Sequence, residues 1–219
     1  MNTYHILSFL SELGANNNKE WMVANRGAYL QAKADFEALV NTLLQNLQAI
    51  DAGLDGLTAK DCVFRINRDI RFSKDKSPYK HNFGASIAEG GKKSLNAGYY
   101  LHIQPGDESF FGGGLYMPPG AQLKKIRQEI DYNAPELLKI VTAEDFKQAY
   151  GRIQGEKLSR APKGYDPHHP NIEFLKLKSY VALHKLSDDD IKSPKLIENL
   201  THNCQVLKPF IDFLNVAIS

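Results

Sequence analysis

The sequence has few of the residues that mark a secreted or membrane-spanning protein. It contains two cysteines, Cys62 and Cys204, which lie far apart and in no metal-binding spacing, so a disulfide framework is not expected. No apolar run approaches the roughly 18 residues that a membrane helix needs, and the first residues lack the pattern of a signal peptide. We therefore expect a cytoplasmic protein that makes no use of the membrane.

Motifs for familiar chemistries are also missing. The sequence has no GxGxxG, GxxxxGK[ST], GxSxG or HExxH pattern. An SxxK pattern occurs twice within residues 73–80, but there it lies between two predicted strands, whereas such a nucleophile normally opens a helix. Asp166, His168 and His169 form a ligand-like cluster, yet prolines on both sides make it look like a rigid loop, so no metal is predicted. The sequence leaves open whether the protein is an enzyme and which cofactor it uses.

What is present is the composition of an ordinary globular chain. Hydrophobic residues make up 42% and charged residues 24% of the 219 residues. A chain of this length can bury about 70% of the surface that it exposes when unfolded. No repeat, low-complexity tract or linker divides it, so residues 1–219 are predicted to form a single domain. Its oligomeric state is not indicated.

Hydrophobic periodicity changes twice along the chain. It is helical before residue 53, in a short helix that ends near Gly14 and a long one that starts at Asn17. A period of two then predicts strands near 62–72, 82–89, 97–104 and 109–117, and a weaker pattern predicts a fifth at 180–186. Helical patterns return after residue 119. This grouping predicts an α+β fold, in which an antiparallel meander of four to five strands is packed by N-terminal and C-terminal helices.

Positive charge is concentrated in one segment. Residues 65–81 hold six basic and two acidic residues, so they carry +4 while the whole chain carries +2 and the remainder −2. A nucleic-acid-binding protein usually presents a broad basic face, so nucleic acid is not the expected partner.

Alternation in this segment places Phe64, Ile66, Ile70 and Phe72 on one face of the predicted strand. Arg68 falls on the same apolar face, where its guanidinium needs a carboxylate or a ligand, because burying an unpaired charge costs several kcal/mol. A bulge in the strand would return Arg68 to the polar face.

The neighbouring predicted strands could complete a pocket. Tyr100, His102 and Gln104 share one face of the 97–104 strand. In the next strand, the glycines at 112–114 indicate a close approach, either by a ligand or by a packed helix.

Arginine forks, lysines and backbone donors in turns suit phosphate and carboxylate groups. We therefore expect a small anionic, phosphate- or carboxylate-bearing ligand to bind at a cluster on the sheet, with turnover possible through His102 or a tyrosine. Two alternatives stay open: a protein- or nucleic-acid-docking module built on the 65–81 hairpin, and a structural network of ion pairs. The candidate ligand-binding residues are Arg65, Arg68, Asp69, Arg71, Lys76, Tyr79, Lys80, Tyr100 and His102.

Seven stretches, the longest of them FRINRDIRFSKDKSPYKHNFGA at 64–85, resemble the bacterial and fungal family known as domain of unknown function 2461. The others are FLSELGANNNKEWM (9–22), AGYYLHIQPG (97–106), FGGGLYMP (111–118), LKKIRQEI (123–130), LSRAPKGYDPHHP (158–170) and PFIDFLN (209–215). The resemblance implies no activity. It does imply that the family signature falls on Arg65, Arg68, Asp69, Arg71, Lys76, Tyr79 and Lys80.

Overall fold

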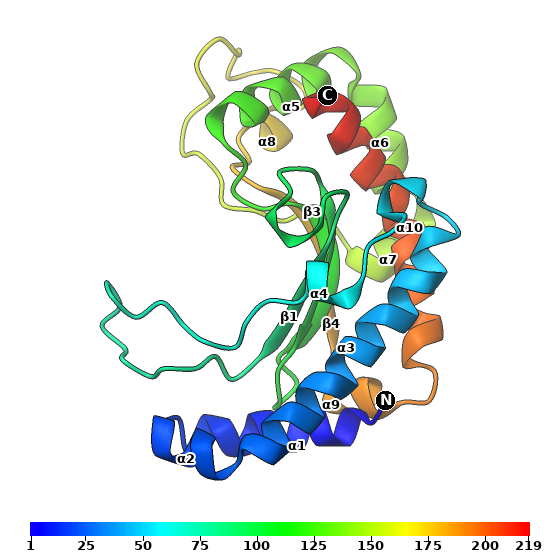
Figure 1. Ribbon diagram of the computed structural model, residues 1–219. Coiled ribbons are helices and arrows are strands. Elements are labelled where there is room, and N and C mark those ends of the chain that lie inside the picture. The colour runs from blue at the N-terminus through cyan, green and yellow to red at the C-terminus, as the bar shows by residue number, and fades with distance from the viewer. The chain divides into compact units, whose positions relative to one another are not determined.

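The computed structural model describes residues 1–219, and its contacts divide them into two compact units (Figure 1). Unit 1 comprises Met1–Lys93, Tyr100–Phe111 and Lys185–Thr201, and unit 2 comprises Ser94–Tyr99, Gly112–His184 and His202–Ser219. One antiparallel sheet in the order β1-β2-β3-β4 confirms the predicted α+β meander, with four strands. The strands are β1 (Phe83–Ile87), β2 (Gly98–Ile103), β3 (Ser109–Leu115) and β4 (Tyr180–Leu186).

Unit 1 is built on a helical N-terminus. It contains α1 (Thr3–Ala15), α2 (Lys19–Ala24), α3 (Arg26–Gln48), α4 (Ala59–Cys62), α9 (Asp188–Lys192) and the short 3₁₀ helices η1 (Ala52–Leu54) and η2 (Gly91–Lys93). The predicted long helix is divided, because the Asn18 side chain caps α2 and the chain bends at Asn25 before α3. The rings of Phe36 and Phe9 pack on Phe83, with centroids 5.3 and 6.2 Å away, so α1 and α3 cover one face of β1.

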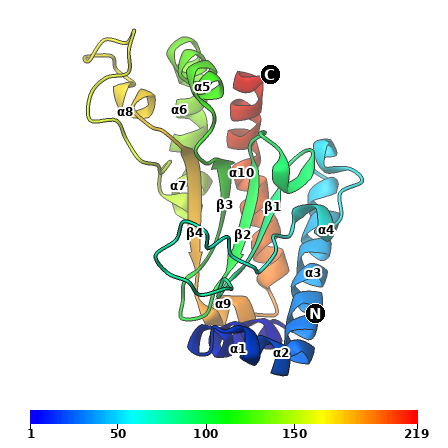
Figure 2. The same cartoon turned by 60° about the vertical axis from the view of Figure 1, so that its left-hand side comes forward.

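The predicted strand at 62–72 is wrong. Residues 64–82 instead form an irregular arm that contains no strand. One isolated β-bridge, Asn67 to Tyr79, lies within the arm, and another, Val63 to Ala85, lies directly before its base. Beyond residue 64 the arm leaves the edge of β1 and folds back on itself, so its polar groups are satisfied locally instead of by a ladder. Figures 1 and 2 show this arm as a long cyan-green loop between α4 and β1.

Unit 2 consists mainly of helices: α5 (Gly120–Tyr132), α6 (Ala134–Thr142), α7 (Glu144–Tyr150), α8 (Ile172–Leu175) and most of α10 (Leu196–Ile218). Pro135 lies in the first turn of α6, as predicted, and Gly151 ends α7 with a φ of 69°. The Tyr150 hydroxyl donates to the Asn203 carbonyl over 2.8 Å, which ties α7 to α10. Lys125 donates to the carbonyls of the last two residues, and α5 lies beside the end of α10 in Figures 1 and 2. No helix of the structure is both long and apolar enough to cross a membrane.

The glycine run of β3 is explained by its neighbouring strands. A Cβ on Gly112 would lie 2.2 Å from the Ala182 carbonyl oxygen, and one on Gly114, whose φ is 122°, would lie 2.0 Å from that of Tyr180. At Gly113 a Cβ would meet the Gly98 carbonyl oxygen at 2.4 Å and the side chain of Leu207 on α10 at 2.8 Å. The predicted close approach is therefore made by the backbone of adjacent strands, together with a helix at one position.

Candidate functional site

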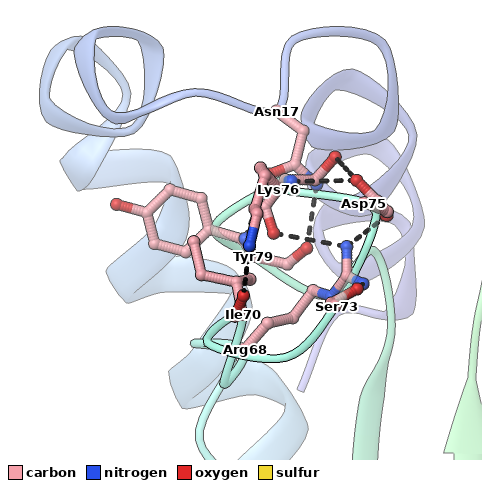
Figure 3. A network of polar contacts seen from close by, with 8 residues as sticks. Asn17, Arg68, Ile70, Ser73, Asp75, Lys76 and Tyr79 are labelled. Atoms are coloured by element: carbon pink, nitrogen blue, oxygen red, sulfur yellow. Dashed lines mark hydrogen bonds and ion pairs between the residues drawn. The ribbon is translucent and has the colours of Figure 1, made fainter.

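Arg68 is held inside the arm (Figure 3). Its guanidinium pairs with the Asp75 carboxylate and also donates to the Ser77 carbonyl at 3.2 Å and the Ser73 hydroxyl at 3.4 Å. Hydrogen bonds from Ser77, and then from Arg68, hold the pKa of Asp75 well below its usual range. Arg68 is therefore paired with the carboxylate of Asp75, within the same loop.

Three further candidate residues are also engaged within the arm. The Arg71 guanidinium donates to both oxygens of Asp69, at 2.9 and 2.7 Å, and these bonds lower the pKa of Asp69. Lys76 donates to the Ile70 carbonyl over 3.0 Å. Arg68 and Arg71 are thus each paired with a carboxylate of the arm, Asp75 and Asp69 respectively.

Asn17 fixes the base of the arm from the turn between α1 and α2. Its side-chain amide donates to the Tyr79 carbonyl at 2.9 Å and accepts from the Tyr79 backbone N–H at 3.1 Å (Figure 3). Sequence reasoning missed this contact, since Asn17 was expected to cap a helix and Asn18 does so instead. Tyr79 thus helps to hold the arm through its backbone N–H and carbonyl.

Arg65 differs from the other two arginines because it forms no hydrogen bond or ion pair. It lines a groove of about 480 Å³ in unit 1. The only acidic side chain in the groove is Glu37, which pairs with Lys33 at 3.4 Å. The groove therefore presents an excess of positive charge above an apolar floor. Its lining residues are Tyr29, Lys33, Glu37, Lys60, Val63, Phe64, Arg65, Ile66, Phe83, Lys92 and Lys93.

The remaining candidates, Lys80, Tyr100 and His102, lie at the open face of β1 and β2. The Lys80 ammonium sits 5.6 Å from the centre of the Phe64 ring. Burial, followed by the nearby charge of Arg65, lowers the pKa of Lys80. Burial also lowers the pKa of His102, although a hydrogen bond with Gln104 opposes this effect, so the imidazole favours its neutral form at pH 7.

The structure thus divides the predicted site residues between two elements. Seven belong to the arm, in which Arg65 also lines the groove and Lys80 stands over Phe64, and two, Tyr100 and His102, lie on β2. The groove lysines at 33, 60, 92 and 93 were missed because each reads as a solvated surface charge, and all but Lys60 are distant from Arg65 in sequence. The adjacent pair Lys92–Lys93, directly after two glycines, was the only available signal.

Metal chemistry finds no support in the side chains. No group of three or more His, Cys, Asp or Glu residues is placed to hold a metal ion. In the loop with Asp166 and His168, the ring of His169 instead pairs with Asp131 on α5 at 3.1 Å.

The fold defines an α+β protein in which N-terminal and C-terminal helices pack on a four-stranded antiparallel sheet. The chain belongs to the family described as conserved hypothetical protein DUF2461, whose model matches residues 5–213. No curated protein and no solved structure matches the chain.

Proposed function

We propose that this protein binds a small phosphate- or carboxylate-bearing anion in the groove that Arg65 lines. The carrying observation is that Arg65 forms no hydrogen bond or ion pair and lines a concave site in which the only carboxylate, Glu37, is paired with Lys33. Hydrogen bonds from Arg71 hold the Asp69 carboxylate and lower its pKa, and the charge of Arg65 lowers that pKa further. A guanidinium can bind phosphate or carboxylate through two parallel hydrogen bonds, and lysines add positive charge without demanding a fixed geometry.

The surroundings of Arg65 support the same proposal. Lys80 is partly buried and forms no ion pair with a carboxylate. The nearby positive charge of Arg65 disfavours the protonated form of Lys80. Two neighbouring cations that repel one another gain from a bound anion, since its negative charge offsets their repulsion.

Isothermal titration of inorganic pyrophosphate and of citrate at low ionic strength tests the proposal. We expect Arg65→Gln to weaken binding at least about tenfold, because a hydrogen bond to a charged group contributes about 1.5–3 kcal/mol. Arg71→Gln is the matched control, since it removes the same charge from the arm, where Arg71 is paired with Asp69. Absence of binding by both anions, or an equal loss in both variants, would reject the groove as the site.

A further inference from the structure

Four aromatic rings form an unbroken series on the open face of the sheet in unit 1. Phe64, at the base of the arm, lies 6.4 Å from the Tyr100 ring, measured between centroids. Tyr100 lies 5.7 Å from Phe110, and Phe110 stacks on His102 at 4.6 Å with an angle of 11° between the ring planes. We call Phe64, Tyr100, His102 and Phe110 the aromatic platform.

Strand alternation keeps the platform on the side away from the core. Tyr99, Leu101 and Ile103 point to the opposite face and are at most 1% exposed, whereas all four platform rings are only half-buried. Gly84 of β1 makes room for the platform, because a Cβ there would lie 2.6 Å from the Tyr100 hydroxyl oxygen. Tyr100 can therefore lie across β1 and reach Phe64 only because residue 84 has no side chain.

Polar groups border the rings. The Lys80 ammonium stands over Phe64, and His81 and Glu108 are close enough to influence the charge of His102. His102 Nε2 and Gln104 Oε1 are 3.2 Å apart, and the Tyr100 hydroxyl makes no hydrogen bond with the protein. Ring surface, hydrogen-bonding groups and a cation without a carboxylate partner thus occur together.

From this combination we propose that the aromatic platform binds the planar heterocyclic ring of an anionic ligand, such as the purine of a nucleotide. The ring stacks on the platform side chains, its heteroatoms meet Tyr100 and Gln104, and its negative group faces Lys80. Phe64 also lines the groove of Arg65, so the two surfaces adjoin. The inference rests on the proposed function for the anionic half of the ligand and adds the ring.

Titration with adenosine monophosphate and with ribose 5-phosphate separates the two halves. We expect the nucleotide to bind at least about tenfold more tightly, since stacking of one base on an aromatic side chain contributes about 1–3 kcal/mol. Phe110→Leu should remove this advantage and leave ribose 5-phosphate binding unchanged. Phe72→Leu, a change at a ring that is 94% exposed on the arm, is the matched control and should alter neither affinity.

The outcomes distinguish the two proposals. Equal affinities for the two compounds, or an unchanged nucleotide advantage in Phe110→Leu, would overturn the ring site while leaving the anion groove intact. Failure of both compounds to bind would also overturn the ring site, whereas the groove is rejected only if pyrophosphate and citrate fail to bind as well. If Phe110→Leu does not fold, NMR of the wild type decides: the ring resonances of Tyr100, His102 and Phe110 should shift with the nucleotide and stay in place with ribose 5-phosphate, and the inference fails if they do not.

Discussion

At the scale of single residues, the partner of a charge determines what the charge can do. Arg65 and Arg68 are three positions apart in the same basic segment, yet Arg68 forms an ion pair with Asp75 and Arg65 forms none. The sequence indicated that Arg68 needs a partner if the segment is a strand, although that strand does not form. It could not show that the partner lies seven residues further on, since that depends on how the arm folds back.

A second buried charge, Asp35, makes a measurable contribution to stability. Burial alone would raise the pKa of this carboxyl, but hydrogen bonds from Gln31, His5 and the backbone of Asn2 together lower it from 3.8 to about 2. Its charged form therefore stabilises the fold above about pH 4, and the contribution is lost as the pH falls toward 2. We expect the difference in unfolding free energy between wild type and Asp35→Asn to shrink over that range.

Urea unfolding followed at pH 5, 4, 3 and 2.5 measures this difference. The exposed Asp55 provides the control. Asp55→Asn removes an equal charge, but the Asp55 carboxylate makes no hydrogen bond. A wild-type advantage over Asp35→Asn that stays constant from pH 5 to 2.5 would contradict the assignment.

At the scale of elements, hydrophobic periodicity predicted the four strands that pack in the sheet and failed for the arm, which is not part of the sheet. The strand at 98–103 alternates strictly between buried and half-buried residues, and those at 109–115 and 180–186 do so over most of their length, whereas in the strand at 83–87 only Ser86 is not buried. Residues 64–72 alternate as well, but their polar groups find partners inside the arm, so the pattern does not extend the sheet. Alternation reports which side chains share a face and not whether a neighbouring strand exists.

The arm should become more mobile when the contact between Asn17 and Tyr79 is removed. Asn17→Ala deletes two hydrogen bonds to Tyr79, each contributing about 0.5–1.5 kcal/mol. We expect backbone amides of residues 66–80 to exchange with solvent about tenfold faster in hydrogen–deuterium exchange, while those of α3 are unchanged. Asn16→Ala is the control, because the Asn16 side chain donates only to the Glu12 carbonyl of α1. Equal exchange of the arm in both variants would show that Asn17 does not hold it.

At the scale of the whole molecule, the predicted single domain stays a prediction. The contacts define two units, but β2, β3 and β4 each have residues in both. Because neither unit can unfold without breaking these strands, we expect one cooperative transition in calorimetry, with equal calorimetric and van't Hoff enthalpies. Two resolved transitions would mean that the units are independent domains. Arg152→Gln, an exposed change in unit 2, should leave the transition unaltered.

The glycine run of β3 has a consequence for the gene that encodes it. Every glycine codon begins with the same two bases, so any single change at those bases introduces a side chain or a stop codon. At all three successive positions that side chain would collide with a carbonyl oxygen no more than 2.4 Å from its Cβ. The coding tract for 112–114 should therefore tolerate only synonymous third-base drift, and a random mutant library of functional clones should be almost empty there.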